Sequence, residues 1–227
     1  MKNLRKQDLL GLGIFAVIFV VFYLLFDQEV LDDYWETNVI MILINIILSV
    51  SLNLINGFTG QFSIGHAGFM AVGAYVSAII TVKLGMDFAL ALIVGTLAAA
   101  FLGFLIGMPT LRLDGDYLAI ATLGLGEIIR IAILNINYVG GASGFMGIPR
   151  LTTFPIAFWI MVFVVYVIKN FKNSADGRAC LAIRENEIAA ETMGINTTKY
   201  KVMAFTIGAG FAGTAGALFS HYYYIAH

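Results

Sequence analysis

The strongest constraint on this chain is a series of seven long apolar runs separated by short polar stretches. About 20 apolar residues are enough for a helix to cross a bilayer. Charged residues make up only 12% of the 227 positions and mean hydropathy is +0.89, whereas a soluble domain is about 25% charged. We therefore predict an all-α, polytopic transmembrane helical bundle of about seven spans: Leu9–Phe26, Val39–Leu54, His66–Val82, Phe88–Met108, Tyr117–Ile136, Phe154–Ile168 and Val202–Ser220.

Basic residues predict how the spans are oriented. Lys2, Arg5 and Lys6 precede the first run, which is longer than the about 7–15 apolar residues of a signal peptide, so we expect a retained span. The loop Asp27–Asn38 is acidic and has no basic residue. Basic residues favour the cytoplasmic side, which predicts a cytoplasmic N-terminus. Six crossings then return the polar interval Lys169–Lys201, which is rich in Lys and Arg, to the same side.

That polar interval is predicted to contain a short folded helix. Asn186 can cap its start, Glu187 suits its positive first turn, and Gly194 suits the left-handed position after its end. Several apolar or weakly polar side chains then share one face: Ile188, Ala189, Thr192, Met193 and Ile195. Such a stripe either fits a groove on a partner or folds back onto the membrane face of the protein itself.

The second span carries a line of polar residues spaced 4, 4 and 3 apart: Asn45, Ser49, Asn53 and Asn56. Amide side chains are unfavourable in hydrocarbon, so this face is expected to point into the bundle. The line serves either interhelical hydrogen bonding or one wall of a translocation path.

A glycine-rich and polar segment, 56–69, follows that line and interrupts the apolar pattern. Irregular backbone near a membrane is tolerated where it is buried in protein or lines a cavity, and such breaks often form transport sites. We therefore predict one broken or re-entrant segment and assign Gln61, Ser63 and His66 to the translocation path. A metal site at His66 lacks a second ligand nearby, and Gln61 replaces the first glycine that a serine-hydrolase motif around Ser63 requires.

Two further patterns lie on later spans. Glu127 and Arg130 are three residues apart in the fifth span and can pair on one helix face. They form either a structural ion pair between helices or a gating or subunit-contact element. Small residues recur every fourth position in two spans and predict close helix packing: Gly95, Ala99, Gly103 and Gly107, then Ala209, Gly213 and Ala217.

Several segments resemble the permeases of ATP-driven ABC importers, specifically the branched-chain amino acid (LivM/LivH-type) family. Its coupling loop is similar to Gly177–Ala179, Ala182–Glu187 and Ala189–Ala190 with Gly194, although Ile188 replaces the usual glutamate. The stretch Asn56–Tyr75 is similar to its signature segment. Residues 113–124, with Glu127 to Arg130, resemble the LivM-type member, and Gly140–Pro149 follows the same pattern. The resemblance covers most of the chain from about Asn45 onward.

The resemblance implies a single transmembrane permease domain over residues 1–227, with residues 169–201 as its cytoplasmic coupling loop. It implies that the loop contacts an ATPase subunit through Asn186, Glu187, Ile188, Ala189, Ala190, Met193 and Gly194. Family members continue through further spans beyond the point corresponding to His227, so the domain is expected to be C-terminally incomplete. The expected location is the cytoplasmic (inner) membrane of a prokaryote.

The resemblance also implies partners: a second permease subunit, two ATPase subunits and an extracytoplasmic substrate-binding protein. The chain has no G-x-x-x-x-G-K-[ST] phosphate loop, so ATP and Mg are expected on the ATPase subunits, with no cofactor bound here and no enzyme activity. Nothing in the sequence suggests nucleic-acid binding. Alternatives are a urea or short-amide importer permease, an ion-coupled secondary transporter using Glu127 and Arg130, and a non-transporting assembly protein.

Overall fold

The protein is a bundle of long helices in a computed structural model that describes residues 2–28, 31–111, 113 and 115–226. Among those residues, six helices are long and apolar enough to cross a membrane, and a shorter apolar stretch covers Gly13–Asp27. The predicted polytopic, all-helical fold of about seven spans is confirmed. The α-helices are α1 (Lys2–Asp27), α2 (Asp33–Asn53), α3 (His66–Ala78), α4 (Phe88–Thr110), α5 (Asp116–Leu134), α6 (Phe154–Asn173), α7 (Ala175–Glu185), α8 (Glu187–Thr192) and α9 (Thr197–Tyr223).

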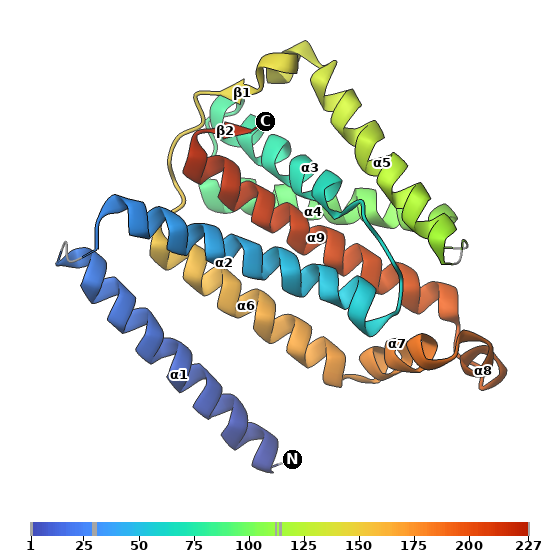
Figure 1. The fold of residues 1–227 in the computed structure, drawn as a ribbon. Coiled ribbons are helices and arrows are strands. Elements are labelled where there is room, and N and C mark those ends of the chain that lie inside the picture. The colour runs from blue at the N-terminus through green and yellow to red at the C-terminus, as the bar shows by residue number, and fades with distance from the viewer. Residues whose placement is uncertain (1, 29–30, 112, 114, 227) are drawn as a thin grey trace.

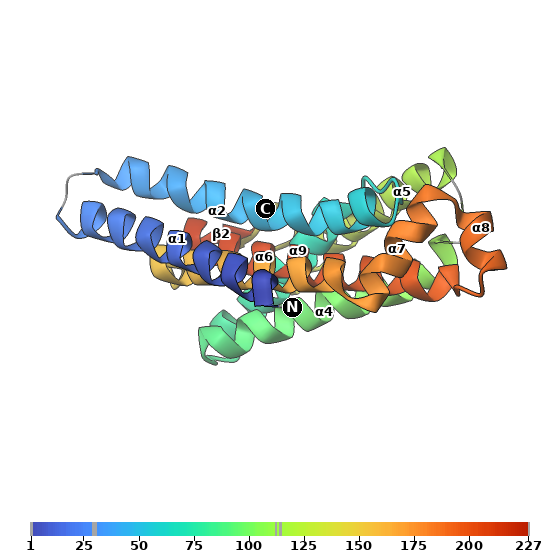
Figure 2. The same ribbon diagram turned by 90° about the horizontal axis from the view of Figure 1, so that it is seen from below.

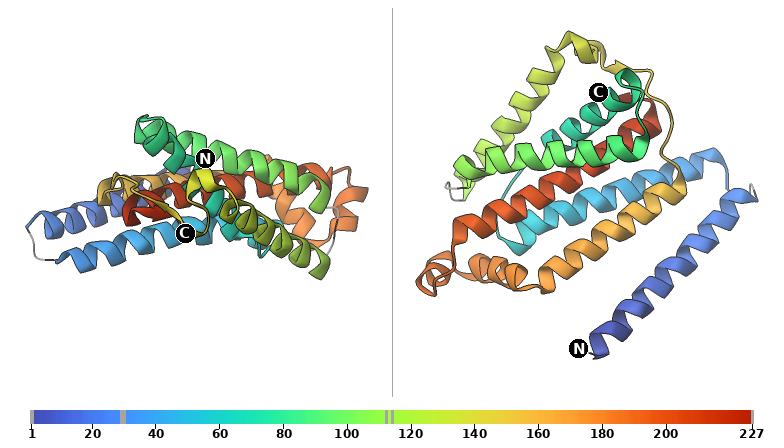
Figure 3. Two further views of the ribbon diagram at one scale, coloured as in Figure 1. Left: turned by 90° about the horizontal axis from the view of Figure 1, so that it is seen from above. Right: turned by 180° about the vertical axis from the view of Figure 1, so that it is seen from behind.

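Helix α9 runs through the middle of the bundle and contacts α2, α3 and α4 (Figure 1). Seen from below, α2 and α4 lie on opposite sides of α9 (Figure 2). Helix α1 packs against α6 at one edge, and α5 packs against α3 at the other edge (Figure 3). Most of α9 is therefore buried, whereas most of α5 is exposed.

Small residues allow the central helices to approach closely. The stripe of α4 and the stripe of α9 are buried, as predicted. A Cβ atom at Gly213 of α9 would lie 2.4 Å from the Cβ of Ala99 in α4, and one at Gly73 of α3 would lie 2.1 Å from the carbonyl oxygen of Gly213. Real Cβ atoms do not approach other atoms so closely, so these contacts require glycine.

A second core joins α2 to α6. Ile40, Ile44 and Ile47 of α2 are almost fully buried, and they belong to one apolar cluster with Phe154 and Phe158 of α6. Phe19 of α1 stacks on Phe154 with ring centroids 5.9 Å apart, which attaches α1 to this cluster. Hence one face of α2 packs in the interior of the bundle. The opposite face is exposed and can contact another molecule.

The second and third spans are irregular at their ends. Helix α2 continues as a π-helical turn, η1 (Leu54–Phe58), and residues 59–65 are irregular before α3 begins. Helix α3 likewise ends in a π-helical turn, η2 (Ile79–Lys83). π-helical turns are rare and occur frequently at functional sites. The segment 59–65 begins beside α7, where Arg184 bonds Gly57, and reaches the interior of α5, where the Ile64 amide donates to Thr122 Oγ1 at 3.1 Å. This course fits the predicted broken or re-entrant segment.

The glycine-rich segment 137–149 lies at the end of the bundle opposite α7 and α8, and it folds over the end of α9. It contains two 3₁₀ turns, η3 (Asn137–Val139) and η4 (Gly141–Ser143). Strand β1 (Phe145–Met146) pairs antiparallel with β2 (Ile225–Ala226), so Phe145 lies opposite Ala226. This short pairing holds the connection between α5 and α6 against the last residues of the described chain.

Candidate functional site

The polar interval 169–201 folds into two helices, α7 and α8, at one end of the bundle (Figure 1). The Asn186 side chain caps α8 because its Oδ1 accepts a hydrogen bond of 3.0 Å from the Ala189 amide. Gly194 adopts a positive φ of 86°, and the Ile195 amide donates to the Ala190 carbonyl, which closes the helix. The predicted capped helix and its glycine stop are therefore confirmed.

The apolar stripe of α8 faces outward. Ile188 is 76% exposed and Met193 is 83% exposed, and Ala189 beside them is exposed too. The alternative in which this stripe folds back onto the protein's own membrane face is therefore wrong. Ala190 differs from its neighbours, since it is buried and faces the rest of the loop. Of the residues expected to meet an ATPase, Ala190 can only support the helix and cannot present a surface.

Polar contacts attach α8 to the start of α9. Glu187 forms an ion pair of 2.5 Å with Lys201, whose side chain is only 9% exposed. Thr197 donates a hydrogen bond of 2.8 Å from Oγ1 to Glu191. Both contacts join residues of α8 to the first turns of the central helix α9.

A buried thiol of helix α7 packs against α9. Cys180 is buried, and its Sγ lies 3.9 Å from the carbonyl oxygen of Tyr200 in α9. Burial, with a smaller contribution from the nearby Asp176 carboxylate, raises the pKa of the Cys180 thiol to about 11. The thiol is thus neutral at physiological pH, as expected for a cysteine that packs and does not react.

The loop also contacts the broken segment that follows α2. Arg184, near the end of α7, donates from Nη1 to the carbonyl oxygen of Gly57 at 3.1 Å. Gly60 has a φ of 70°, and a Cβ there would lie 3.1 Å from Cγ of Arg184. A cavity of about 360 Å³ lies between this segment, the start of α5 and the loop. Sequence reasoning missed this role of Arg184, because nothing in the spacing relates it to residues more than a hundred positions earlier.

The three path candidates in the broken segment are all buried. The His66 ring bonds Ser51 of α2 through Nε2 at 2.8 Å. Asn56 fixes the backbone of the segment, since its Oδ1 accepts from the Ser63 amide at 3.2 Å. The Gln61 amide, the Ser63 hydroxyl and His66 Nδ1 have no hydrogen-bond partner among the described residues. Leaving a buried polar group unsatisfied costs about 1–3 kcal/mol, so these atoms are suited to bind water or a polar ligand.

The polar line on α2 points out of the bundle, whereas the prediction placed it inside. Asn45, Ser49 and Asn53 are exposed, whereas the interior face consists of the aliphatic residues described above and Ser51. The expectation that these three side chains point into the bundle is wrong within this chain. Asn56 alone of the line turns partly inward. The spacing predicts that these side chains share one face of α2, but it does not say whether this chain or another molecule covers that face.

Glu127 and Arg130 do form an ion pair, and it lies within α5. Nη2 of Arg130 is 2.5 Å from Oε1 of Glu127, and Nε is 3.0 Å and 3.1 Å from the two carboxylate oxygens. The pair therefore does not join two helices of this chain, as one interpretation supposed. Both side chains are also exposed, which is unusual for charges this far along a spanning helix.

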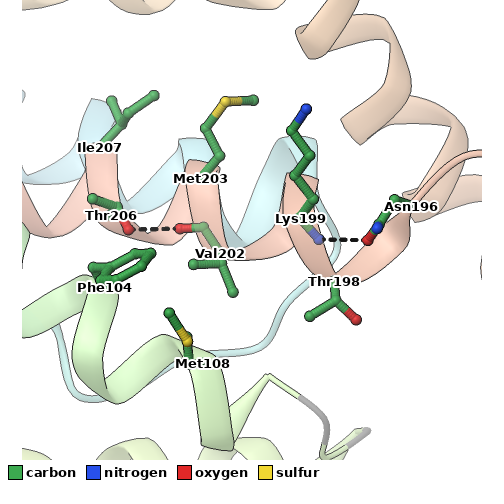
Figure 4. A pocket seen from close by; sticks show the side chains of 9 residues that line it. All are labelled: Phe104, Met108, Asn196, Thr198, Lys199, Val202, Met203, Thr206 and Ile207. Atoms are coloured by element: carbon green, nitrogen blue, oxygen red, sulfur yellow. Dashed lines mark hydrogen bonds between the residues drawn. The ribbon is translucent and has the colours of Figure 1, made fainter.

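A different cavity, apolar and about 660 Å³ in volume, lies between α4 and α9 (Figure 4). Its walls are Phe104 and Met108 of α4 and Val202, Met203 and Ile207 of α9, with Lys199 at one end. The hydroxyl of Thr206 is bonded to the Val202 carbonyl at 2.8 Å, as Figure 4 shows, and so offers no free donor. The other polar side chains of this groove, Asn196, Thr198 and Lys199, lie at one end of it (Figure 4). The groove is therefore not lined by polar groups along its length, as a path for a polar solute would be.

Comparison with known proteins identifies the family of this chain. Residues 36–227 match the model of a family described as the branched-chain amino acid transport system permease component. The chain belongs to this permease family. It is 38% identical over 215 residues to the high-affinity branched-chain amino acid transport system permease protein LivM of Salmonella typhimurium, which covers 79% of the chain and 51% of the relative. Identity to the probable LivM of Methanocaldococcus jannaschii is 27%, over 78% of the chain and 64% of the relative.

The permease family has a second type, and the chain is less similar to it. The LivH protein of Salmonella typhimurium is 26% identical over 208 residues, covering 78% of the chain and 66% of the relative. The chain is thus LivM-like within the family, as its sequence motifs predicted. It spans about half the length of the LivM proteins of Salmonella typhimurium and Escherichia coli. No solved structure matches the chain significantly.

Proposed function

We propose that this chain is a transmembrane permease subunit of an ATP-driven importer for branched-chain amino acids, which an extracytoplasmic binding protein delivers. Support comes from its membership of the permease family and from the printed function of its LivM relatives. The relatives give no support to a urea or short-amide importer, to an ion-coupled secondary transporter or to a non-transporting assembly protein.

The observation that carries this proposal is the exposed apolar face of α8. Ile188 and Met193 project from a capped helix that pairs with α9, and the preceding helix α7 bonds the segment after α2 through Arg184. An apolar helix face of this kind suits a groove on a water-soluble partner. That partner is an ATPase subunit in the proposed assembly, and its closure on ATP displaces α8. The displacement reaches Gly57 through Arg184 and reaches the core through Lys201. Different contacts in the two ATPase states supply the free energy of the change.

The translocation path in this proposal runs along the outward face of the bundle. The exposed polar line of α2 and the exposed ion pair of α5 are unfavourable toward lipid. A second permease subunit would close the path over them. Gln61 borders the cavity beside the coupling loop, and His66 lies deeper, where it bonds Ser51 of α2. The buried, unpaired polar atoms of Gln61, Ser63 and His66 are suited to bind water or substrate on this path.

We place the chain in the cytoplasmic (inner) membrane of a prokaryote, with α8 and the N-terminus in the cytoplasm. In support, the start of α1 and the helices α7 and α8 lie at the same end of the bundle (Figure 1), and both regions are rich in basic residues. Two ATPase subunits carry the ATP and Mg in this assembly, and the chain itself holds no cofactor and contacts no nucleic acid.

The test is a charge placed on the α8 face. In the assembled importer in liposomes, Ile188→Asp and Ala189→Asp are expected to abolish leucine uptake and to weaken co-purification of the ATPase. Thr198→Asp is the matched control, since it adds the same charge at an exposed position in the first turn of α9, where an acid suits the helix dipole. Wild-type uptake in both α8 variants would overturn the docking role.

A further inference from the structure

The exposed ion pair of α5 lies close to the middle of its span. Glu127 comes eleven residues after Asp116, the first residue of α5. At about 1.5 Å per residue this is about 16 Å along a helix that crosses a hydrocarbon core about 30 Å thick. The side chains of Glu127 and Arg130 are nevertheless 50% and 63% exposed in this chain.

Lipid is not a suitable environment for these two side chains. A charged side chain at the centre of a spanning helix is unfavourable, and such residues usually face a bundle interior or a water-filled cavity. Pairing within one helix reduces this cost but leaves both polar heads uncovered. The pair therefore requires water or a polar ligand beside it.

A cleft of about 300 Å³ lies next to the pair, between the start of α3 and the middle of α5. Gly65 and Gly68 bring the two helices together, since a Cβ at Gly65 would lie 2.2 Å from the Thr122 carbonyl oxygen and one at Gly68 would lie 3.1 Å from Cα of Gly126. The remaining wall is small and aliphatic, formed by Ile64, Ala67, Ala71 and Leu123. This volume is at the lower end of the range for small-molecule sites, about 300–1,000 Å³.

The pair retains capacity for further hydrogen bonds. Arg130 uses Nε and Nη2 to bind Glu127, and its Nη1 makes no hydrogen bond to any residue that the structure describes. A guanidinium fork suits a carboxylate, and each oxygen of Glu127 can accept a further bond. A ligand that carries one carboxylate and one ammonium group would therefore complete both ends of the pair without adding net charge to the membrane interior.

We propose that this cleft binds an α-amino acid zwitterion, with the ligand carboxylate on Arg130, its ammonium group on Glu127 and its aliphatic side chain on the wall that includes Ala67 and Leu123. The site deepens the proposed function, on which it rests, by locating a substrate-binding position within the membrane. The apolar groove between α4 and α9 does not fit such a ligand, because Lys199 is the only charged residue in its lining among those that the structure describes.

The test is protection of an introduced cysteine, Ala67→Cys, in the assembled complex. A water-soluble methanethiosulfonate reports this position because the native Cys180 is buried. Leucine at ten times its dissociation constant is expected to slow labelling about tenfold, since occupancy leaves about one site in eleven free. Leucinamide lacks the carboxylate and 4-methylpentanoate lacks the ammonium group, so each is expected to protect much less at the same concentration.

Variants of the pair provide a second, independent readout. Arg130→Gln, and Arg130→Lys if the first does not assemble, are expected to remove the protection by leucine, whereas Asp116→Asn, an exposed charge on the same helix outside the cleft, keeps it. Equal protection by all three compounds, protection that survives both Arg130 variants, or a cysteine that never reacts in the complex would overturn the site. If leucine uptake and its dependence on Ile188 persist in any of those cases, the proposed function stands and only this site fails.

Discussion

The contact between Gly73 of α3 and Gly213 of α9 gives a quantitative test of the packing argument. In Gly73→Ala, the new Cβ would lie 2.1 Å from the Gly213 carbonyl oxygen and 2.3 Å from its Cα. Ordinary contact begins at about 3.4 Å, so the shortfall is about 1.3 Å. Both opposing atoms belong to the backbone and cannot rotate away. The two helices must therefore separate along the interface that holds α9 in the core.

The expected cost follows from this geometry. Overpacking of a close-packed interior costs about 1–3 kcal/mol. A clash with backbone atoms is expected at the upper end of this range, because the backbone cannot rotate away. A gap of 0.5–1 Å elsewhere in the interface also forfeits about a quarter to a half of the dispersion attraction there. Alanine gains about 1 kcal/mol of helix propensity over glycine, which offsets part of this cost. We expect a net loss of about 1–2 kcal/mol in the free energy of unfolding.

Gly124→Ala is the matched control. Gly124 lies within α5, and a Cβ there would meet nothing within 4 Å. The same propensity gain applies without the steric term, so the two variants are expected to differ by about 2–3 kcal/mol. Reversible unfolding in mixed detergent micelles measures both free energies. Equal changes in the two variants would refute the claim that close backbone approach governs this interface.

Four further outcomes are expected around the coupling loop. Glu187→Gln removes the charge that pairs with Lys201 and is expected to cost about 1 kcal/mol locally, which would speed amide exchange in α8 about fivefold. Asn186→Ala is expected to have a similar effect through loss of the helix cap, whereas Asn186→Asp should retain wild-type exchange. Arg184→Ala is expected to reduce uptake while the ATPase still co-purifies, because it removes the bond to the segment after α2 without changing the α8 face; loss of both would contradict this. Because its pKa is raised to about 11, only about one Cys180 thiol in a thousand is ionised at pH 8, so a maleimide is expected to label it only after unfolding, and labelling of the folded chain would contradict its burial.

The helices could be predicted from the sequence because each signal for them is local. Apolar run length predicted the spans, and Asn186 and Gly194 predicted both ends of α8. Small residues at every fourth position predicted the faces along which α4 and α9 pack. In each case the controlling contact lies within a few residues or on one helix face, where periodicity is informative.

The direction in which a polar face points could not be predicted in the same way. Asn45, Ser49 and Asn53 share one face of α2, as their spacing predicted. That face is exposed, because the aliphatic residues on the other side of α2 pack on α6 and α9. The polarity of a face says that it avoids lipid, but not which molecule covers it. The hydrogen bond between Arg184 and Gly57 could not be predicted either, since it joins a side chain to a main-chain oxygen far away in the sequence.

The uncovered polar residues on α2 and α5 have a consequence for the life of the polypeptide in the cell. In the proposed assembly, a newly inserted copy that has not yet met its companion subunit exposes amides and an ion pair to hydrocarbon. We expect such a copy to be less stable in the membrane than an assembled one, and so more open to proteolysis. Synthesis of this polypeptide by itself is therefore expected to give a short-lived product, whose abundance rises when the companion subunit is made beside it.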